Sequence, residues 1–169
     1  IGVRLVGSEM CIRDSPNYSS NKRVYFTYSK KRGEFKTTAL GYGILTNNKL
    51  KNFKEIFVAK GESSKRIHFG SRITFTEDNK IFMSVGDRGQ RPNAQNLKNH
   101  FGKIMRFNDD GSIPKDNPYV GKKQGLDEIW SYGHRNPQGL YYDKEEKILY
   151  EMEHGCLLYT SDAADEEDS

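Results

Sequence analysis

Short apolar runs separated by polar turn residues recur along the chain and predict β-strands. Val, Ile, Tyr, Phe and Thr dominate the runs, whereas Gly, Asn, Asp and Lys gather between them, which is typical of short antiparallel strands. Helical periodicity is scarce, and a single short helix is expected around Ala94–His100. The expected strands are Val24–Ser29, Thr38–Leu45, Lys54–Ala59, Arg72–Thr76, Ile81–Gly86, Gly102–Phe107, Glu128–Tyr132, Gly139–Tyr142 and Ile148–Glu153.

Two pairs of these strands are separated by turns short enough to form β-hairpins. Arg72–Thr76 and Ile81–Gly86 flank a Glu-Asp-Asn turn, and Gly139–Tyr142 and Ile148–Glu153 flank an Asp-Lys-Glu-Glu turn. Asn and Asp favour such turns because their side chains bond to the nearby backbone and tolerate left-handed conformations. Hairpins of this kind suit the blades of a β-propeller. A β-sandwich fits the same pattern, and no strict internal repeat separates the two folds.

The two ends of the chain differ from the part between them. Met10–Asp14 and Cys156–Ser161 can be encoded by reverse-complementary nucleotide sequences, and both resemble translated sequencing adapter. We therefore expect residues 1–15 and 156–169 to be adapter-derived and exclude them from fold reasoning. Residues 16–155 are then expected to be an internal fragment of a longer protein, called the parent protein below. Both cysteines lie in the two ends, so cysteine content indicates no redox compartment.

Charge does not point to a nucleic-acid partner. The two ends hold two of the 27 Lys and Arg residues and seven of the 23 Asp and Glu residues, which leaves 25 basic against 16 acidic residues in the central part. Clustered positive charge is the usual footprint of nucleic-acid binding. Here the basic residues are scattered through turns such as Lys30-Lys31-Arg32, so we expect a solvated surface. No apolar run approaches the roughly 20 residues that cross a bilayer, so no transmembrane segment is expected.

His68 is the histidine with the most favourable context for catalysis. It lies just before the strand Arg72–Thr76, in a loop, where active-site groups are often found. Imidazole can take a proton from an alcohol at neutral pH. Asp87 follows the strand that pairs with Arg72–Thr76 in the hairpin. It is therefore expected at the same end of the hairpin as His68, where its carboxylate can orient the imidazole ring. An ordinary turn explains Asp87 equally well, and His100 and His154 are more typical of structural histidines.

The densest group of polar and aromatic side chains runs from Ile129 to Gly139. Within it, Arg135 offers a planar fork of donors that can bind carboxylate or quinone oxygens. Asn136 and Gln138 can each donate and accept hydrogen bonds. Taken alone, these residues predict a site for a planar, polyanionic or carbonyl-rich ligand.

Motifs along nearly all of Pro16–Gly155 resemble, in order and spacing, the glucose/sorbosone dehydrogenase family, most closely its soluble aldose sugar dehydrogenase branch. The run from Glu128 to Gly139 is the most specific of them. The resemblance implies an all-β chain that forms about half of a six-bladed β-propeller. The other matching motifs are His68-Phe69-Gly70, Gly86-Asp87-Arg88-Gly89, Ala94-Gln95-Asn96-Leu97, Gly102-Lys103, Asp109-Asp110-Gly111-Ser112-Ile113-Pro114, Asp116-Asn117-Pro118 and Glu153-His154-Gly155.

The same resemblance implies an oxidoreductase that holds pyrroloquinoline quinone (PQQ) and calcium and oxidises aldose sugars to lactones. By position, His68 matches the general base, and Asp87 matches the acid that pairs with it. Arg135 matches the cation beside the C5 oxygen of the quinone, and Asn136 and Gln138 match residues that contact PQQ. An external electron acceptor and a periplasmic or secreted parent protein are expected by family analogy.

Three positions depart from the family pattern. Gly155 matches the first residue of a Gly-Pro pair whose main-chain oxygens bind calcium, but Cys156 stands in place of the Pro. Ile67 precedes the expected base where some glucose-specific members have Asp, which favours broad aldose use. Ser71 replaces a frequent Gly.

Two other functions fit a propeller. A noncatalytic module that binds carbohydrate or protein would not require His68, Asp87 and Arg135, and all three are present. A calcium-dependent lactonase would require its own carboxylate ligands, and it does not explain the Arg-Asn-Pro-Gln run. The isolated chain is expected to be inactive and poorly folded, because an open propeller exposes sheet edges.

Overall fold

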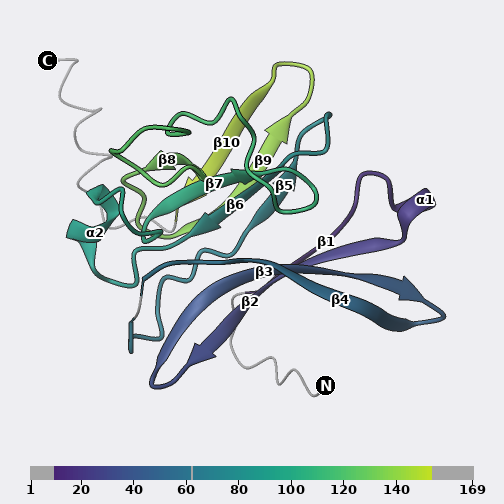
Figure 1. The fold of residues 1–169 in the computed structure, drawn as a ribbon, viewed down its shortest axis with the longest axis horizontal. Helices are drawn as coiled ribbons and strands as arrows, with labels where there is room; N and C mark the ends of the chain where they lie inside the picture. Colours follow the sequence, from purple (N-terminus) through teal and green to yellow (C-terminus); the bar gives the residue numbers. More distant parts are fainter. Residues whose placement is uncertain (1–9, 62, 154–169) are drawn as a thin grey trace, which may run out of the picture.

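The regular structure of the chain consists mainly of strands, which are arranged in three antiparallel sheets (Figure 1). The computed structural model describes residues 10–61 and 63–153. The first sheet contains β1 (Cys11–Asp14), β2 (Arg23–Arg32), β3 (Phe35–Thr46) and β4 (Lys49–Val58). The second contains β5 (Ile73–Phe75), β6 (Ile81–Val85), β7 (Lys103–Phe107) and β8 (Ile129–Tyr132). The third is the pair β9 (Pro137–Asp143) and β10 (Ile148–Glu153), and the two short helices are α1 (Tyr18–Asn21) and α2 (Arg91–Gln95).

Strand order follows chain order in each of the four-stranded sheets. Every strand pairs antiparallel with its sequence neighbour, so each of these sheets is a simple up-and-down meander. Four-stranded meanders are the blades from which β-propellers are built. The expected all-β, partial propeller architecture is therefore confirmed.

Both hairpins predicted from the sequence form. β5 pairs with β6 through Ile73 and Met83, and β9 pairs with β10 through Tyr141 and Tyr150. β2 and β3 are longer than expected because their pairing continues to Arg32 and Phe35, beside the turn. β1 was not among the expected strands, since its residues lie in the segment assigned to adapter. The adapter origin of residues 1–15 and 156–169 stays a prediction.

The predicted helix Ala94–His100 is wrong in its position and length. α2 begins earlier, at Arg91, because Pro92 occupies the first turn, where its missing N–H costs nothing. It ends at Gln95, and Asn96 is extended. The side chains of Asn96 and Asn99 then bond to backbone N–H groups two residues ahead and form turns in place of a helix. No helix in the described part of the chain is long and apolar enough to cross a membrane.

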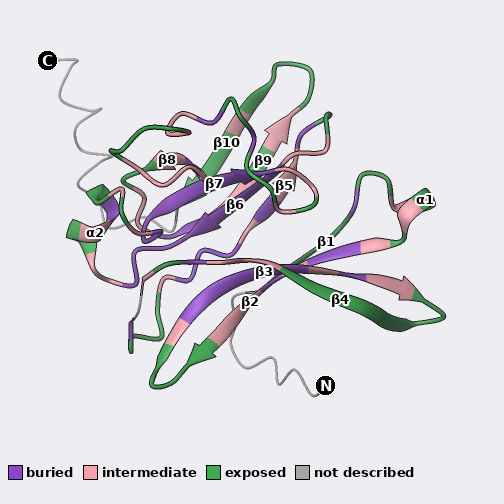
Figure 2. Ribbon diagram, in the orientation of Figure 1, coloured by how far each residue is buried: buried purple, intermediate pink, exposed green. Residues whose placement is uncertain are grey.

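The core lies between the two four-stranded sheets. Tyr25 and Leu40 extend from the first sheet and Met83 and Met105 from the second, and all four are fully buried. Figure 2 shows this burial along β6 and β7, whereas β4 is exposed along most of its length. Each fully buried apolar side chain of this size contributes roughly 1.5–3 kcal/mol to stability. The packing joins the first two blades and fixes the loops at their ends.

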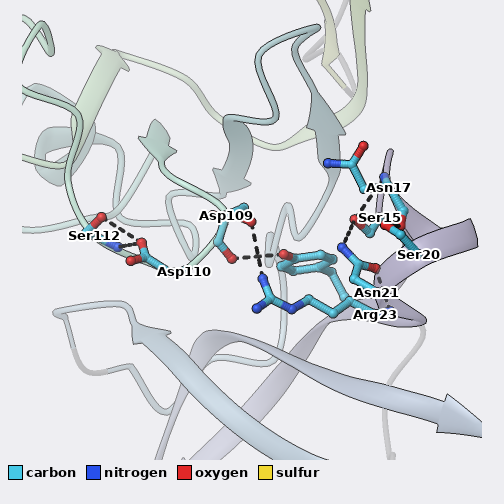
Figure 3. A network of polar contacts seen from close by, with 9 residues as sticks. Ser15, Asn17, Ser20, Asn21, Arg23, Asp109, Asp110 and Ser112 are labelled. Carbon is cyan, nitrogen blue, oxygen red and sulfur yellow. Dashed lines mark hydrogen bonds and ion pairs between the residues drawn. The ribbon is translucent and has the colours of Figure 1, made fainter.

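A polar network joins the sheets at one end of the second blade (Figure 3). The turn after β7 brings Asp109 to β2, where Arg23 Nη1 lies 3.2 Å from Asp109 Oδ2 and the Tyr25 hydroxyl donates to the Asp109 carbonyl at 2.8 Å. Asn21 donates to Ser15 Oγ at 2.9 Å and holds the α1 turn in place. β7 runs toward this end, so the loops at its beginning form the opposite end of the blade.

His100 is a buried histidine that joins the first two sheets. Its Nδ1 accepts a hydrogen bond from the Lys60 backbone N–H at 2.6 Å, and its Nε2 lies 2.8 Å from Glu128 Oε1. Because Nδ1 is an acceptor, the ring is neutral with its proton on Nε2. Burial lowers the pKa of His100 below its ordinary value of 6.5, although Glu128 opposes this effect. The histidine is therefore structural, as its sequence context suggested.

Acidification is expected to destabilise the parent protein through His100. Below pH 6.5 the unfolded chain binds a proton at this ring, whereas the folded chain binds it only at lower pH. Stability is therefore lost as the pH falls through this window, by at most about 1.4 kcal/mol per pH unit for one group. Melting temperatures between about pH 7.5 and 5.5 test this, with His100→Gln as a non-titrating control. Equal acid-induced losses in both proteins would contradict the assignment.

Candidate active site

His68 and Asp87 meet at the end of the second blade opposite Asp109. His68 Nδ1 lies 2.7 Å from Asp87 Oδ1, and the two side chains are 18% and 1% exposed. Asp87 Oδ1 also accepts the Gly89 backbone N–H at 2.7 Å, so the carboxylate is fixed from two directions. A carboxylate can only accept, which assigns the imidazole proton to Nδ1 and leaves Nε2 as the basic nitrogen. The pair has the geometry of a base with its orienting acid.

The backbone around this pair is strained. His68, Ser71 and Arg88 have φ values of 53°, 69° and 55°, in the left-handed region that non-glycine residues seldom adopt. Gly86 makes this arrangement possible, because a Cβ added there would lie only 2.2 Å from the His68 carbonyl oxygen. Backbone strain of this kind is concentrated at functional sites. The loop before β5 and the end of β6 therefore pack closely against each other at His68 and Gly86.

The loop between β8 and β9 brings Arg135 and Asn136 to the same place. The Asp87 backbone N–H donates to the Arg135 carbonyl at 2.8 Å, so Asp87 contacts both His68 and the Arg135 peptide. Asn136 is 2% exposed, and its Oδ1 accepts the Gly70 backbone N–H at 3.2 Å. The side-chain oxygen of Asn136 therefore joins the loop between β8 and β9 to the loop before β5. His68, Asp87, Arg135 and Asn136 form one cluster drawn from three segments of the chain.

Gln138 and Gly155 are the remaining two predicted site residues. Gln138 is the second residue of β9, and its carbonyl accepts the Arg72 Nε–H at 2.6 Å, which ties it to the strand after His68. The residue as a whole is half-buried. Gly155, the residue expected to bind calcium, lies outside the described residues.

Two buried cations that support the site had no predicted role. The Arg88 guanidinium carbon lies 3.2 Å from the centroid of the Phe69 ring, and Nη2 donates to Thr38 Oγ1 of β3 at 2.8 Å. Arg88 thus fixes the residue after His68 against the first blade. The only sequence signal for it was its place in the Gly-Asp-Arg-Gly motif.

Lys103 is the second buried cation. Its Nζ lies 3.1, 2.7 and 2.6 Å from the carbonyl oxygens of Asn93, Ala94 and Phe101. Burial lowers the pKa of Lys103 to about 8. The Ala94 carbonyl also accepts the Gly133 N–H, so this ammonium group supports the base of the loop that carries Arg135.

A group of acidic side chains and a histidine lies beside the Arg135 peptide. His134, Glu151 and Glu153 bring one ligand atom each within 4.8 Å of the others, a spacing that a metal ion could bridge. Hydrogen bonds already account for this spacing, because His134 Nδ1 lies 3.2 Å from an oxygen of each glutamate. The other ring nitrogen of His134, Nε2, lies 2.8 Å from Ser131 Oγ.

Comparison with known proteins places this chain in a family of sugar dehydrogenases. The family described as Glucose / Sorbosone dehydrogenase matches residues 10–158. Aldose sugar dehydrogenase YliI of Escherichia coli (strain K12) is 37% identical over 144 residues, which cover 83% of this chain and 39% of that protein. Quinoprotein glucose dehydrogenase B of Acinetobacter calcoaceticus is 32% identical over 115 residues, which cover 57% of this chain and 24% of that protein.

A solved structure gives the same result for the fold. The PQQ-bound form of Aldose Sugar Dehydrogenase from Streptomyces coelicolor superposes with a TM-score of 0.76 at 28% identity, over 89% of this chain and 43% of that one. The chain therefore spans less than half of the length of each of these proteins. Because the family match takes in most of its residues, the chain belongs to the glucose/sorbosone dehydrogenase family.

Proposed function

We propose that the parent protein oxidises the C1 hydroxyl of an aldose sugar to a lactone, with PQQ as the hydride acceptor and calcium as an assisting ion. The observation that carries this proposal is the pairing of His68 with buried Asp87 at 2.7 Å, directly beside the Arg135 peptide. Relatives named as an aldose sugar dehydrogenase and a quinoprotein glucose dehydrogenase support it, as does a PQQ-bound structural neighbour.

His68 acts as the general base in this proposal. Its Nδ1–H donates to Asp87, so Nε2 takes the proton of the C1 hydroxyl. Asp87 holds the ring in this tautomer and stabilises the positive charge that the ring gains. PQQ, when bound, supplies an electrophilic quinone carbon that accepts the C1 hydride. With PQQ bound, Arg135 would place a cation where negative charge develops on the quinone oxygen, and it would then stabilise the transition state more than the bound substrate.

The residues near His68 suit PQQ, a planar quinone with three carboxylates. Arg135 supplies a cation, and the amides of Asn136 and Gln138 supply donors and acceptors at the same end of the blade. Asn136 is already braced against Gly70, so it meets a ligand without first losing side-chain freedom. The family resemblance assigns the main-chain oxygen of Gly155 to calcium, and hard cations prefer such carbonyl ligands.

Broad aldose use is part of the same proposal. Ile67 is 48% exposed beside His68 and offers the substrate an apolar surface. An apolar side chain discriminates weakly between sugars that differ in a single hydroxyl group, whereas a site built to bond that hydroxyl discriminates strongly.

Dye reduction by the full-length parent protein tests the proposed function. We expect an aldose to reduce an artificial electron acceptor only when both PQQ and Ca²⁺ have been added. Omission of PQQ and chelation of Ca²⁺ are the controls. A folded, PQQ-loaded protein that shows no aldose-dependent reduction would support the noncatalytic binding module instead.

The 169-residue chain alone is expected to be inactive in the same assay. Tyr141, Tyr150 and Met152 are 62%, 48% and 68% exposed on one face of the β9–β10 hairpin, an apolar surface that isolated soluble domains seldom present. Their side chains share this face because Tyr141 pairs with Tyr150, and Met152 lies two residues along. PQQ-dependent reduction by the purified chain would contradict this expectation.

A further inference from the structure

Both backbone polar groups of Arg135, its N–H and its C=O, make hydrogen bonds. Its N–H points at the Glu153 carboxylate, with distances of 3.1 Å to Oε1 and 3.0 Å to Oε2. Its carbonyl accepts the Asp87 N–H at 2.8 Å. Hydrogen bonds to a charged acceptor are about twice as strong as bonds between neutral groups. Glu153 and Asp87 therefore fix the orientation of the backbone from which the Arg135 side chain and Asn136 extend.

An irregularity in the pairing of β9 with β10 lies next to Glu153. Met152 pairs with Gly139, but Glu153 pairs with Pro137, so the pairing skips Gln138. Irregularities of this kind bend a strand and redirect a side chain, and they are frequent beside active sites. Here the shift brings Glu153 next to the loop that carries Arg135, 18 residues earlier in the chain.

The neighbours of Glu153 restrain its carboxylate further. His134 Nδ1 lies 3.2 Å from Glu153 Oε1, and Ser131 orients the same ring through Nε2. The Glu153 side chain is 26% exposed and that of His134 is 15% exposed, so solvent competes only partly for these bonds. Glu151 contacts His134 but makes no described hydrogen bond to Arg135, which offers a matched control in the same strand.

We propose that Glu153 is a positioning residue: its carboxylate fixes the Arg135 peptide so that the guanidinium group faces the cofactor beside His68. This inference rests on the proposed function for the identity of the cofactor. The contact between Glu153 and the Arg135 N–H does not depend on it.

PQQ binding to the full-length apo protein with Ca²⁺, measured by calorimetry, tests this role. Glu153→Ala is expected to weaken PQQ binding about 10- to 100-fold, the usual effect of removing a charge-assisted hydrogen bond. Glu153→Gln keeps one acceptor oxygen, so its affinity for PQQ is expected to lie between those of Glu153→Ala and the parent protein. Glu151→Gln is expected to bind PQQ within about twofold of the parent, which is the scatter of a surface change.

A double-mutant cycle separates positioning from a general structural effect. If Glu153 acts through Arg135, then Glu153→Ala added to Arg135→Ala is expected to weaken PQQ binding by a much smaller factor than it does alone. The same fold loss in both backgrounds, or parent-like binding by Glu153→Ala, would overturn the proposal.

Amide hydrogen exchange at Arg135 provides a readout that needs no cofactor. Glu153→Ala is expected to speed exchange of this amide, whereas Glu151→Gln is expected to leave it protected. If the parent protein does not bind PQQ, the proposed function fails while this measurement still decides whether Glu153 holds the peptide. Unchanged Arg135 exchange in Glu153→Ala would overturn the positioning role.

Discussion

His68→Ala is expected to lower kcat for aldose oxidation by about 10²- to 10⁴-fold in the full-length parent protein, the usual contribution of a general base. Its Nε2 is the basic nitrogen because the Nδ1 proton points at Asp87, and alanine removes both nitrogens. Steady-state dye reduction with saturating PQQ, Ca²⁺ and aldose measures the effect.

Backbone strain at His68 calls for a second variant. The residue has a φ of 53°, and asparagine tolerates this conformation better than alanine does. His68→Asn is therefore expected to keep PQQ binding and the melting temperature while it loses activity to the same degree. Arg66→Ala, an exposed substitution in the same loop, is the matched control and is expected to retain activity. Undiminished activity in both His68 variants would remove the residue from the mechanism.

Asp87→Asn is expected to lower kcat by about 10²-fold or more while it preserves the shape of the site. The amide oxygen can still accept the Gly89 N–H and the Nδ1–H of His68, but the negative charge that stabilises the protonated ring is lost. Since Asp87 is only 1% exposed, solvent cannot replace that charge effectively. The same dye-reduction assay measures the effect.

The control for this substitution lies at the other end of the same hairpin. Asp78 pairs with Lys80 in the turn between β5 and β6, far from His68 in the strand direction. Asp78→Asn is expected to change the melting temperature slightly and to leave kcat near the parent value. If Asp87→Asn retained parent activity with intact PQQ binding, the carboxylate would be structural, and the ordinary-turn interpretation of its motif would hold.

The hairpins that carry the site are local features, so they could be predicted from the sequence. Apolar runs flanking an Asp-Asn turn determine the β5–β6 pair, and its register forces the residues before β5 and after β6 to the same end. The proximity of Asp87 to His68 follows from that register alone. The distance between them does not, since it depends on the close approach that Gly86 permits.

Features that depend on tertiary contacts could not be predicted from the sequence. The position of α2 is decided by Pro92 and by the bonds from Lys103 to its last carbonyls. Lys103 is a charged residue in a fully buried strand, and no local pattern predicts such a partner. The role of Glu153 depends on an irregular pairing between β9 and β10, which the alternation of apolar residues does not reveal.

In the proposed reaction, His68 removes the proton of the C1 hydroxyl while hydride passes from the aldose C1 to bound PQQ. A single-turnover experiment tests it most directly. The PQQ-loaded parent protein is mixed with an aldose without oxygen or dye, and the lactone formed is quantified. We expect lactone in an amount equal to the bound PQQ, and almost none on the same timescale from His68→Asn loaded with the same amount of PQQ. Lactone formation at the parent rate in His68→Asn, or no lactone from the loaded parent protein, would contradict it.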